Sequence, residues 1–286
     1  MKHEIIIGDC LDSLAELPPD TFQTCITSPP YWGLRDYNVD GQLGMESTPD
    51  EFVGNLVRVL RLAKRVLRDD GTVWLNLGDS YYNYRPGAGQ SMPKQTVSET
   101  SQDLPQVCAR RGNKIEGLKE KDLIGIPWRA ALALQADGWY LRQDIIWHKP
   151  NPMPEKNSLD RCHRAHEYIF LLSKSQSYYF DGAAITEATS ICGERNKRSV
   201  WTCNTSRFSG AHFATFPPKL VEPCIKAGSR PGDKVLDPFG GAGTVGLVAD
   251  RLGRDSTLLE LNPEYAELAR KRLIDDAPLL CEVKIL

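Results

Sequence analysis

Short apolar runs alternate along the chain with longer stretches in which apolar residues recur every three or four positions. A short run predicts a buried strand, whereas the three-to-four spacing predicts a helix that buries one face. The predicted strands are residues 3–7, 22–28, 71–77, 139–147, 168–172, 235–236 and 257–261. The predicted helices are residues 11–17, 52–67, 123–134, 245–252 and 264–273. Because strands and helices alternate, we expect an α/β fold with a mostly parallel sheet covered on both faces.

In two long stretches the apolar residues show no regular spacing. The first, residues 84–122, is rich in glycine, proline, serine, glutamine and basic residues, and the second runs from 173 to about 213. Both are predicted to be surface insertions within a single domain that spans residues 1–286. The expected parts of that domain are residues 1–83, 84–122, 123–174, 175–212, 213–275 and a C-terminal tail at 276–286.

Composition excludes several classes of protein. No stretch approaches the roughly 18 uninterrupted apolar residues of a membrane span, and the first ten residues lack the features of a secretion signal, so we expect a cytoplasmic protein with no membrane contact. The eight cysteines include no C-x-x-C pair, which favours reduced thiols and no metal site. The formal net charge is only −2, so a nucleic-acid partner would require a local positive surface.

The stretch CITSPPYWGLRDY ends a predicted strand abruptly. Pro29 and Pro30 donate no backbone hydrogen bonds, so the carbonyls before them are left as free acceptors. A ligand with an amino group placed there would meet these carbonyls, Ser28 and the ring of Tyr31 together. The pattern therefore predicts a binding site for an amino group.

A second candidate site is the stretch VLDPFGGAGT. A predicted strand ends at Asp237, Gly240 and Gly243 belong to a loop that opens a helix, and Glu260 ends the next strand about 20 residues later. Glycines let a ligand approach the backbone, and the second carboxylate can accept both ribose hydroxyls, which indicates a nucleoside site. A simple tight turn would leave both acids unexplained, and the absence of a phosphate-gripping lysine argues against ATP or GTP.

Together these stretches resemble the motifs of S-adenosylmethionine-dependent methyltransferases. DPFGGAGT followed by LLELNPEY is similar to their cofactor site, and TSPPYW is similar to the catalytic motif of enzymes that methylate exocyclic amino groups of DNA bases. Because the catalytic motif precedes the cofactor loop, the order resembles the circularly permuted β class. Further matches are GDC, DIIWHKPNPMP, HEYIFLLSKS and FATFPPKL. The resemblance implies a Rossmann-like fold, S-adenosyl-L-methionine as the cofactor and double-stranded DNA as the substrate.

The resemblance also implies a mechanism. The amino nitrogen of a base is a poor nucleophile because its lone pair is delocalised into the ring. Ser28 Oγ and the Pro29 carbonyl would accept the two amino hydrogens and return the lone pair to the nitrogen. Tyr31 would stack on a base turned out of the duplex. The implied catalytic residues are Ser28, Pro29, Pro30 and Tyr31.

The target base follows from the first residue of the motif. In enzymes of this kind serine leans toward cytosine N4 and aspartate toward adenine N6, so Ser28 favours cytosine and leaves adenine as the alternative. Formation of 5-methylcytosine would need a cysteine nucleophile beside a proline. The one Pro-Cys pair, Pro223-Cys224, falls in an apparent helix upstream of the cofactor loop, and we discard that chemistry.

The resemblance assigns further residues to the cofactor. Those expected around the methionine end and sulfur are Asp237, Pro238, Phe239, Gly240, Gly243 and Thr244. Glu260 is expected on the ribose and Asp9 near the adenine, although Asp9 could instead cap a helix. The segment expected to close over the methionine moiety contains Phe216, Pro217 and Lys219. Asn262 either joins this set or only caps the helix that begins at Pro263.

Basic residues of the two insertions are the candidates for DNA contacts. Positive side chains release counterions from phosphates, and some could reach base edges, although a solvated loop is the competing interpretation. The resemblance places the target-recognition region at residues 175–212. The candidates are Arg110, Arg111, Lys149, Arg195, Lys197, Arg198 and Arg207. His148 and His163 receive no catalytic role, because a protonated amine product loses its proton readily.

Two other functions stay open at this point. Methylation of a glutamine amide in a protein uses a similar Pro-Pro-Tyr site, but those enzymes usually carry the cofactor loop before the catalytic motif. A methyltransferase that has lost activity and only binds nucleic acid is the second alternative, and both motifs are intact. The sequence leaves open the recognition sequence, a cognate restriction endonuclease and the oligomeric state.

Overall fold

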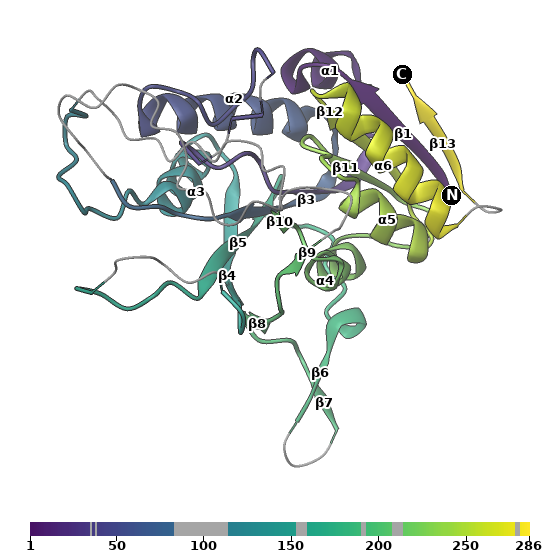
Figure 1. Ribbon diagram of the computed structural model, residues 1–286. Coiled ribbons are helices and arrows are strands. Elements are labelled where there is room, and N and C mark those ends of the chain that lie inside the picture. Colours follow the sequence, from purple (N-terminus) through teal and green to yellow (C-terminus); the bar gives the residue numbers. More distant parts are fainter. Residues whose placement is uncertain are drawn as a thin grey trace.

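The computed structural model describes residues 1–34, 36–37, 39–82, 114–152, 159–189, 193–207, 214–277 and 281–286. Within these residues the molecule is built on one large sheet with helices on both faces (Figure 1). The predicted candidates Arg110 and Arg111 lie outside the described residues.

Over the described ranges, the central sheet has nine strands in the order β13-β1-β12-β11-β2-β3-β5-β4-β8. All neighbouring pairs are parallel except the two that β5 makes with β3 and β4. The strands are β1 (Lys2–Ile7), β2 (Phe22–Thr27), β3 (Leu67–Leu77), β4 (Tyr140–His148), β5 (His166–Ser173), β8 (Val200–Thr202), β11 (Lys234–Asp237), β12 (Asp255–Glu260) and β13 (Glu282–Ile285). The mostly parallel α/β sheet predicted from the sequence is confirmed.

In the part of the chain that the structure describes, six helices cover the sheet in two layers. One layer contains α1 (Cys10–Glu16), α2 (Pro49–Val66) and α3 (Ile126–Ala136), and the other contains α4 (Pro218–Gly228), α5 (Thr244–Arg251) and α6 (Pro263–Asp276). Smaller elements are η1 (Ala183–Ile185) and the short strands β6 (Glu187–Ala188), β7 (Glu194–Arg195), β9 (Ser206–Arg207) and β10 (Ala214–Thr215). In Figure 1 the β6–β7 hairpin extends away from the sheet.

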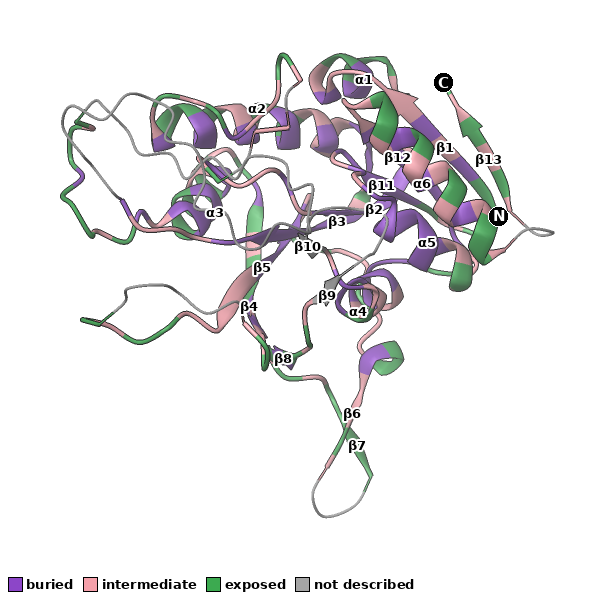
Figure 2. Ribbon diagram, viewed as in Figure 1, coloured by how far each residue is buried: buried purple, intermediate pink, exposed green. Residues whose placement is uncertain are grey.

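Strand β3 shows how the sequence separates the two cores. Val73, Leu75 and Leu77 point into the core beneath α1, α2 and α3, whereas Trp74 points into the core beneath α4, α5 and α6. Successive side chains of a strand face opposite sides of the sheet, so an uninterrupted apolar run supplies both cores. The central strands are accordingly buried (Figure 2).

The structure differs from the predicted elements at the sheet edges. β8 and β13 were not predicted, and β13 lies in the stretch expected to be a tail. Both are only three or four residues long and half exposed, so neither has the apolar run that marks a central strand. β3 also begins at Leu67, directly after α2, and α3 begins at Ile126, where Pro127 occupies its first turn.

The sheet brings four strand ends together. β1, β12, β11 and β2 are parallel neighbours, so their carboxyl ends lie along one edge. Ligands bind at this edge in open α/β sheets. None of the helices in the described part of the chain is both long and apolar enough to cross a bilayer.

Candidate active site

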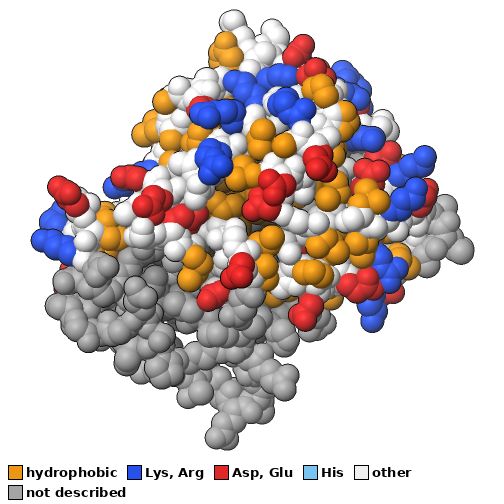
Figure 3. Space-filling model, turned by 90° about the horizontal axis from the view of Figure 1, so that it is seen from above, with side chains coloured by type: hydrophobic (Ala, Val, Ile, Leu, Met, Phe, Trp, Pro, Cys, Tyr) orange, Lys and Arg blue, Asp and Glu red, His pale blue; other side chains and the backbone are white. Residues whose placement is uncertain are grey.

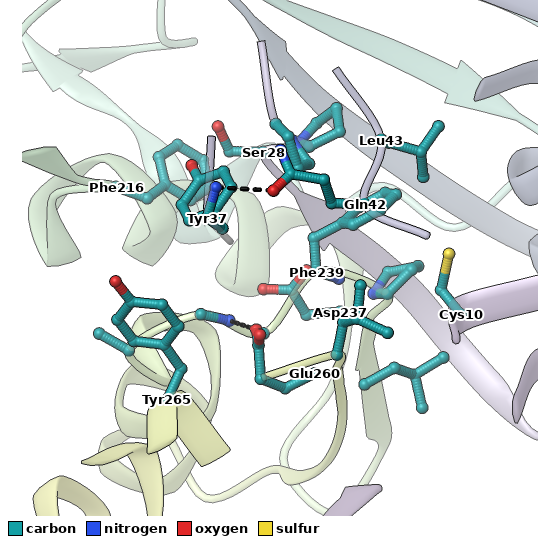
Figure 4. Close-up of a pocket in the computed structure, with 18 of the residues that line it drawn as sticks. Cys10, Ser28, Tyr37, Gln42, Leu43, Phe216, Asp237, Phe239, Glu260 and Tyr265 are labelled. Carbon is teal, nitrogen blue, oxygen red and sulfur yellow. Dashed lines mark hydrogen bonds between the residues drawn. The ribbon is translucent and has the colours of Figure 1, made fainter. Parts of the chain in front are cut away.

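A cavity of about 320 Å³ lies at the carboxyl ends of these four strands (Figure 4), within the size range of small-molecule sites. Ser28 and Glu260 lie on opposite sides of it, with Asp237 and Phe239 between them. The predicted site residues that line the cavity are Asp9, Ser28, Pro29, Pro30, Tyr31, Lys149, Phe216, Asp237, Pro238, Phe239, Gly240, Thr244, Glu260 and Asn262. The two motifs identified in the sequence therefore face one space.

Three predicted cofactor residues do not line the cavity. Gly243 is the N-cap of α5 with φ 73°, and a Cβ there would lie 2.8 Å from the Cβ of Ala269, so this glycine serves the turn and the helix packing. Pro217 is the buried N-cap of α4, and Lys219, in the first turn, is exposed. Phe216 alone of that segment reaches the cavity.

Glu260 ends β12 with its carboxylate between two backbone donors. Oε2 accepts from Gly241 N at 2.7 Å and Oε1 from Asn262 N at 2.9 Å. A carboxylate offers about four acceptor positions, so two remain for hydroxyls of a ligand. Burial raises the pKa of Glu260, and the two N–H groups oppose that rise.

Asp237 ends the neighbouring strand β11 and is almost fully buried. Its Oδ1 accepts from Thr27 Oγ1 at 2.7 Å and from Phe239 N at 3.0 Å. Burial raises the pKa of Asp237 to about 7, while the bonds from Thr27 and Phe239 lower it. A carboxylate in such surroundings gains most from a positively charged ligand.

These features match the groups of S-adenosylmethionine. A buried carboxylate, Asp237, and a partly buried one, Glu260, in a cavity with mostly apolar walls suit a ligand that carries positive charge and ribose hydroxyls. The Gly240 loop rests on β12, because a Cβ at Gly240 would lie 2.9 Å from the Cβ of Leu258. The residues present therefore fit this cofactor.

Asp9 and Asn262 both cap helices and both line the cavity. Asp9 Oδ1 accepts from Leu11 N at 2.7 Å at the start of α1, and Asn262 Oδ1 accepts from Glu264 N at 2.9 Å at the start of α6. The capping interpretation is confirmed for each residue, and it leaves room for a second contact because a carboxylate or amide oxygen accepts more than one bond.

Ser28 belongs to a hydrogen-bond network that the sequence did not predict. Its hydroxyl donates to Asn76 Oδ1 at 3.1 Å, and the Tyr31 hydroxyl donates to Glu167 Oε2 at 2.7 Å. Asn76 Nδ2 in turn donates to Glu167 and to the Tyr168 carbonyl. The only sequence signal was a polar residue inside each of two apolar strands, β3 and β5.

Lys149 lies in this network rather than on the outer surface. Its ammonium donates to Glu167 Oε1 and lies 4.1 Å from the centroid of the Trp147 ring. The side chains of Lys149 and Glu167 are each 15% exposed. Its position favours a role in the pocket over the predicted contact with DNA.

Gly78 fixes the ring of Tyr31. A Cβ at Gly78 would lie 2.5 Å from Tyr31 Cε2, so only glycine lets the ring rest on this part of the backbone. The backbone at Gly78 therefore limits where the Tyr31 ring can lie. A glycine directly after an apolar strand was a weak signal, because glycine commonly ends strands.

Other cavity residues that were not predicted come from loops and from α6. The rings of Tyr37 and Tyr265 lie edge to face, with centroids 6.4 Å apart, and join the loop after Ser28 to the first turn of α6. Gln42 Oε1 accepts from Tyr37 N at 2.6 Å. Residues in loops follow no regular spacing of apolar positions, so the sequence pattern could not identify them.

The cysteine chemistry of 5-methylcytosine enzymes finds no support. Cys224 is fully buried inside α4, and burial raises the pKa of its thiol. A nucleophilic cysteine needs an accessible thiolate. The described cysteines are free thiols: Cys10, Cys25, Cys162, Cys203, Cys224 and Cys281.

Of the predicted DNA-contact residues of the second insertion, Arg195, Lys197 and Arg198 lie in or just after the β6–β7 hairpin. Arg195 and Arg198 both donate to Glu187 Oε1, and Lys197 lies over the Trp201 ring at 5.3 Å. Arg207 lies in β9. The face viewed from above in Figure 3, which is turned away from the β6–β7 hairpin, carries basic side chains in several places with acidic side chains between them.

One group of described side chains has the composition of a metal site. His3, Asp250 and Cys281 bring ligand atoms within 4.8 Å of one another. His3 already pairs with Asp250 at 3.0 Å and with Ser256 at 2.8 Å. The group does not line the cavity, so the prediction that catalysis needs no metal stays a prediction.

Comparison with known proteins places the chain in a family. The family model described as DNA methylase (N6_N4_Mtase) matches residues 22–271. The Type II methyltransferase M.Cfr9I of Citrobacter freundii is 51% identical over 266 residues, which are 93% of this chain and 86% of that protein.

Two solved structures share the fold. PvuII DNA methyltransferase (cytosine-N4-specific) has a TM-score of 0.70 at 20% identity and covers 99% of this chain and 95% of its own. The M1.HpyAVI–SAM complex has a TM-score of 0.55 at 19% identity, with coverages of 95% and 98%. Because the family model spans residues 22–271 and M.Cfr9I is 51% identical, this chain belongs to the DNA methylase family of S-adenosylmethionine-dependent amino-methyltransferases, with the catalytic motif before the cofactor loop as in the circularly permuted form.

Proposed function

We propose that this protein transfers a methyl group from S-adenosylmethionine to the exocyclic N4 of a cytosine turned out of double-stranded DNA. The observation that carries the proposal is the position of Ser28. Its hydroxyl hydrogen is donated inward to Asn76 Oδ1, so its lone pairs are available on the side of the cavity that it shares with Asp237 and Glu260.

The chain supplies acceptors to the reacting nitrogen. Ser28 Oγ and the Pro29 carbonyl accept the two amino hydrogens, and the nitrogen lone pair then leaves conjugation with the ring. The nitrogen forms a bond to the methyl carbon and afterwards loses one proton to water, while the bonding electron pair of the broken methyl–sulfur bond stays on sulfur. The bound cofactor supplies an electrophilic methyl on a sulfonium, and positioning supplies much of the rate. Tyr31 holds the base by stacking on it.

The cofactor is held from the opposite side. Asp237 would face the positively charged ammonium and sulfonium groups, and Glu260 would accept from the ribose hydroxyls through the lone pairs left by Gly241 and Asn262. Asp9, Phe216 and Phe239 complete the walls. The remaining cofactor residues in this proposal are Pro238, Gly240, Thr244 and Asn262.

The choice of cytosine rests on Ser28 as the first residue of the motif. A serine hydroxyl is a neutral acceptor, and the serine form of the motif leans toward cytosine. Adenine N6 is the alternative, since the same two acceptors would serve it. The cytosine-N4-specific PvuII enzyme shares only 20% identity with this chain, so its specificity adds little.

The relatives support DNA as the substrate and a restriction–modification setting. M.Cfr9I carries the name of a Type II methyltransferase, and we propose that this chain likewise modifies DNA as the partner of a cognate restriction endonuclease. We place the protein in the cytoplasm with that DNA. The DNA contacts would come from Arg195, Lys197, Arg198 and Arg207. The family match weighs against the glutamine-amide and the non-catalytic alternatives.

The test is incubation of the purified protein with S-adenosylmethionine and unmethylated plasmid DNA, followed by mass spectrometry of the digested nucleosides. N4-methylcytosine is the expected product. N6-methyladenine would move the target to the alternative base, and 5-methylcytosine or unmodified DNA would contradict the proposal.

A further inference from the structure

We infer that Glu167 is a positioning residue that fixes the direction of the hydrogen bonds at Ser28. The inference rests on the proposed function and adds the group that keeps Ser28 an acceptor. The Glu167 carboxylate meets three donors: Oε2 accepts from the Tyr31 hydroxyl at 2.7 Å and from Asn76 Nδ2 at 3.3 Å, and Oε1 accepts from Lys149 Nζ.

The amide of Asn76 has only one orientation that satisfies these neighbours. Its Nδ2 donates to Glu167 and, at 3.0 Å, to the Tyr168 carbonyl, both of which only accept. Exchange of the amide oxygen and nitrogen would place acceptor against acceptor in a side chain that is almost fully buried. Oδ1 is therefore held toward Ser28.

The hydroxyl hydrogens then have fixed destinations. Ser28 donates its single hydrogen to Asn76 Oδ1 at 3.1 Å. The Tyr31 hydroxyl also lies 3.1 Å from Asn76 Oδ1, but the Glu167 carboxylate at 2.7 Å is its nearer acceptor. Burial and the neighbouring Glu167 carboxylate raise the pKa of Tyr31, so its phenol stays protonated and donates to Glu167. With its hydrogen turned away from the cavity, Ser28 Oγ can only accept, as an amino N–H requires.

Lys149 holds the other end of the network. Its positive charge at Oε1 leaves Oε2 for Tyr31 and Asn76. Removal of one partner from a pair this little exposed leaves a charge without compensation. Lys149 and Glu167 therefore act as one unit, and their effect reaches Ser28 through Asn76.

The variant Glu167→Gln tests this chain of bonds while keeping the shape of the side chain. Lys149 would attract the oxygen of the new amide, whose NH₂ group would then face Asn76 Nδ2. Two opposed donors would turn Asn76 at the cost of its bond to the Tyr168 carbonyl, and its Nδ2 would then donate to Ser28 Oγ. We expect kcat on plasmid DNA to fall about 100-fold, as when one stabilising hydrogen-bond partner is lost from an active site. The KM for S-adenosylmethionine should change less than about threefold, because Glu167 acts only on the chemical step.

A second substitution distinguishes a reversed hydrogen bond at Ser28 from a general disruption of the pocket. When Lys149→Met is added to Glu167→Gln, the cation is removed, so the amide introduced at position 167 can present its oxygen to Asn76 again. The double variant should regain about tenfold in kcat over Glu167→Gln, although Lys149→Met alone lowers kcat. Glu282→Gln, an exposed glutamate of β13 that pairs with Lys284, is the matched control and should keep the wild-type rate.

The outcomes distinguish the inference from the proposed function. Wild-type protein that methylates DNA, together with a Glu167→Gln variant within about threefold of its kcat, would overturn the inference alone. Loss of rate in Glu167→Gln without recovery in the double variant would overturn it as well. A wild-type protein that transfers no methyl to DNA would overturn both. The melting temperatures of the wild type, the two single variants and the double variant, measured without substrate, report the coupling of Lys149 and Glu167 in stability. A purely structural pair would show coupling in the melting temperatures and none in kcat.

Discussion

Thr27 Oγ1 donates a 2.7 Å hydrogen bond to Asp237 Oδ1 and so joins the strand that ends in the catalytic motif to the strand that ends in the cofactor loop. The two residues are 210 positions apart in the chain. Because β2 and β11 are parallel neighbours, the last residues of both strands reach the same edge of the sheet. The bond holds the Asp237 carboxylate against Thr27, the residue directly before Ser28.

Cofactor affinity should depend on pH through Asp237. Burial raises the pKa of this carboxyl to about 7, so it is neutral at pH 6 and mostly ionised at pH 8 in the free protein. A bound cation favours the ionised form, and the Kd for S-adenosylmethionine should fall about tenfold over this interval. Titration calorimetry at both pH values measures the change.

The variant Asp237→Asn is the control for that titration, because any ionisation of the cofactor itself affects both proteins equally. The Kd of this variant for S-adenosylmethionine should not show the fall between pH 6 and pH 8 that comes from ionisation of Asp237. An equal pH dependence of Kd in both proteins would refute the role of Asp237 in binding the cofactor. The pKa of Asp237 is higher in the folded protein than in the unfolded chain, so the protonated side chain stabilises the fold. This contribution is complete at pH values below the pKa of the unfolded chain and is lost as the pH rises through about 7. Without cofactor, the variant should therefore melt at a higher temperature than wild type at pH 8.

Gly78→Ala should disable the base pocket. The added Cβ would lie 2.5 Å from the Tyr31 ring, which must move, so we expect kcat to fall by more than about tenfold while cofactor binding is retained. Gly54→Ala is the matched substitution in α2, where a Cβ meets nothing within 4 Å. It should leave kcat unchanged and stabilise the protein by about 0.5–1 kcal/mol. Equal kcat values in the two variants would contradict the placement of Tyr31.

Arg195 and Arg198 should contribute to DNA affinity as phosphate contacts. Each alanine substitution should weaken binding at low salt and reduce the slope of log K against log salt by about one. Since both arginines donate to Glu187, Glu187→Gln should strengthen DNA binding by releasing them. Arg270→Ala, in an exposed pair on α6, is the control. Fluorescence anisotropy over a salt series measures all four variants, and unchanged slopes for Arg195 and Arg198 would argue against the contacts.

Substitution of Ser28 should lower the catalytic rate, whereas substitution of Glu260 should lower the affinity for the cofactor. Ser28→Ala removes an acceptor from the reacting nitrogen and should lower kcat about 100-fold with little change in DNA affinity. Glu260→Ala removes the acceptor for the ribose and should weaken cofactor binding about 10- to 100-fold, since hydrogen bonds to a charged group contribute about 1.5–3 kcal/mol. Equal losses of DNA binding in both variants would contradict these roles.

The parts of the site that follow from strand ends could be predicted from the sequence. Ser28, Asp237 and Glu260 each stand where an apolar run stops, and parallel strands bring their ends together. The family motifs identified the same residues. A local pattern was therefore enough for the cofactor loop and the catalytic motif.

Asn76 and Glu167 could not be predicted in the same way. They meet only because β3 and β5 pair antiparallel, and the register of that pair, Asn76 opposite Ile169, is set by tertiary packing. Lys149 was predicted at the DNA surface because a positive charge beside prolines has no local sign of burial. β13 was missed because four half-exposed residues carry too weak a pattern.

The most direct test of the account is a single-turnover reaction with S-adenosylmethionine carrying a deuterated methyl group, run with wild-type protein and with Ser28→Ala. The account predicts that the labelled methyl appears on N4 of deoxycytidine with the wild-type protein, at a rate about 100-fold above that of the variant. Label on carbon 5 of cytosine or on the protein, or equal rates for the two proteins, would contradict it.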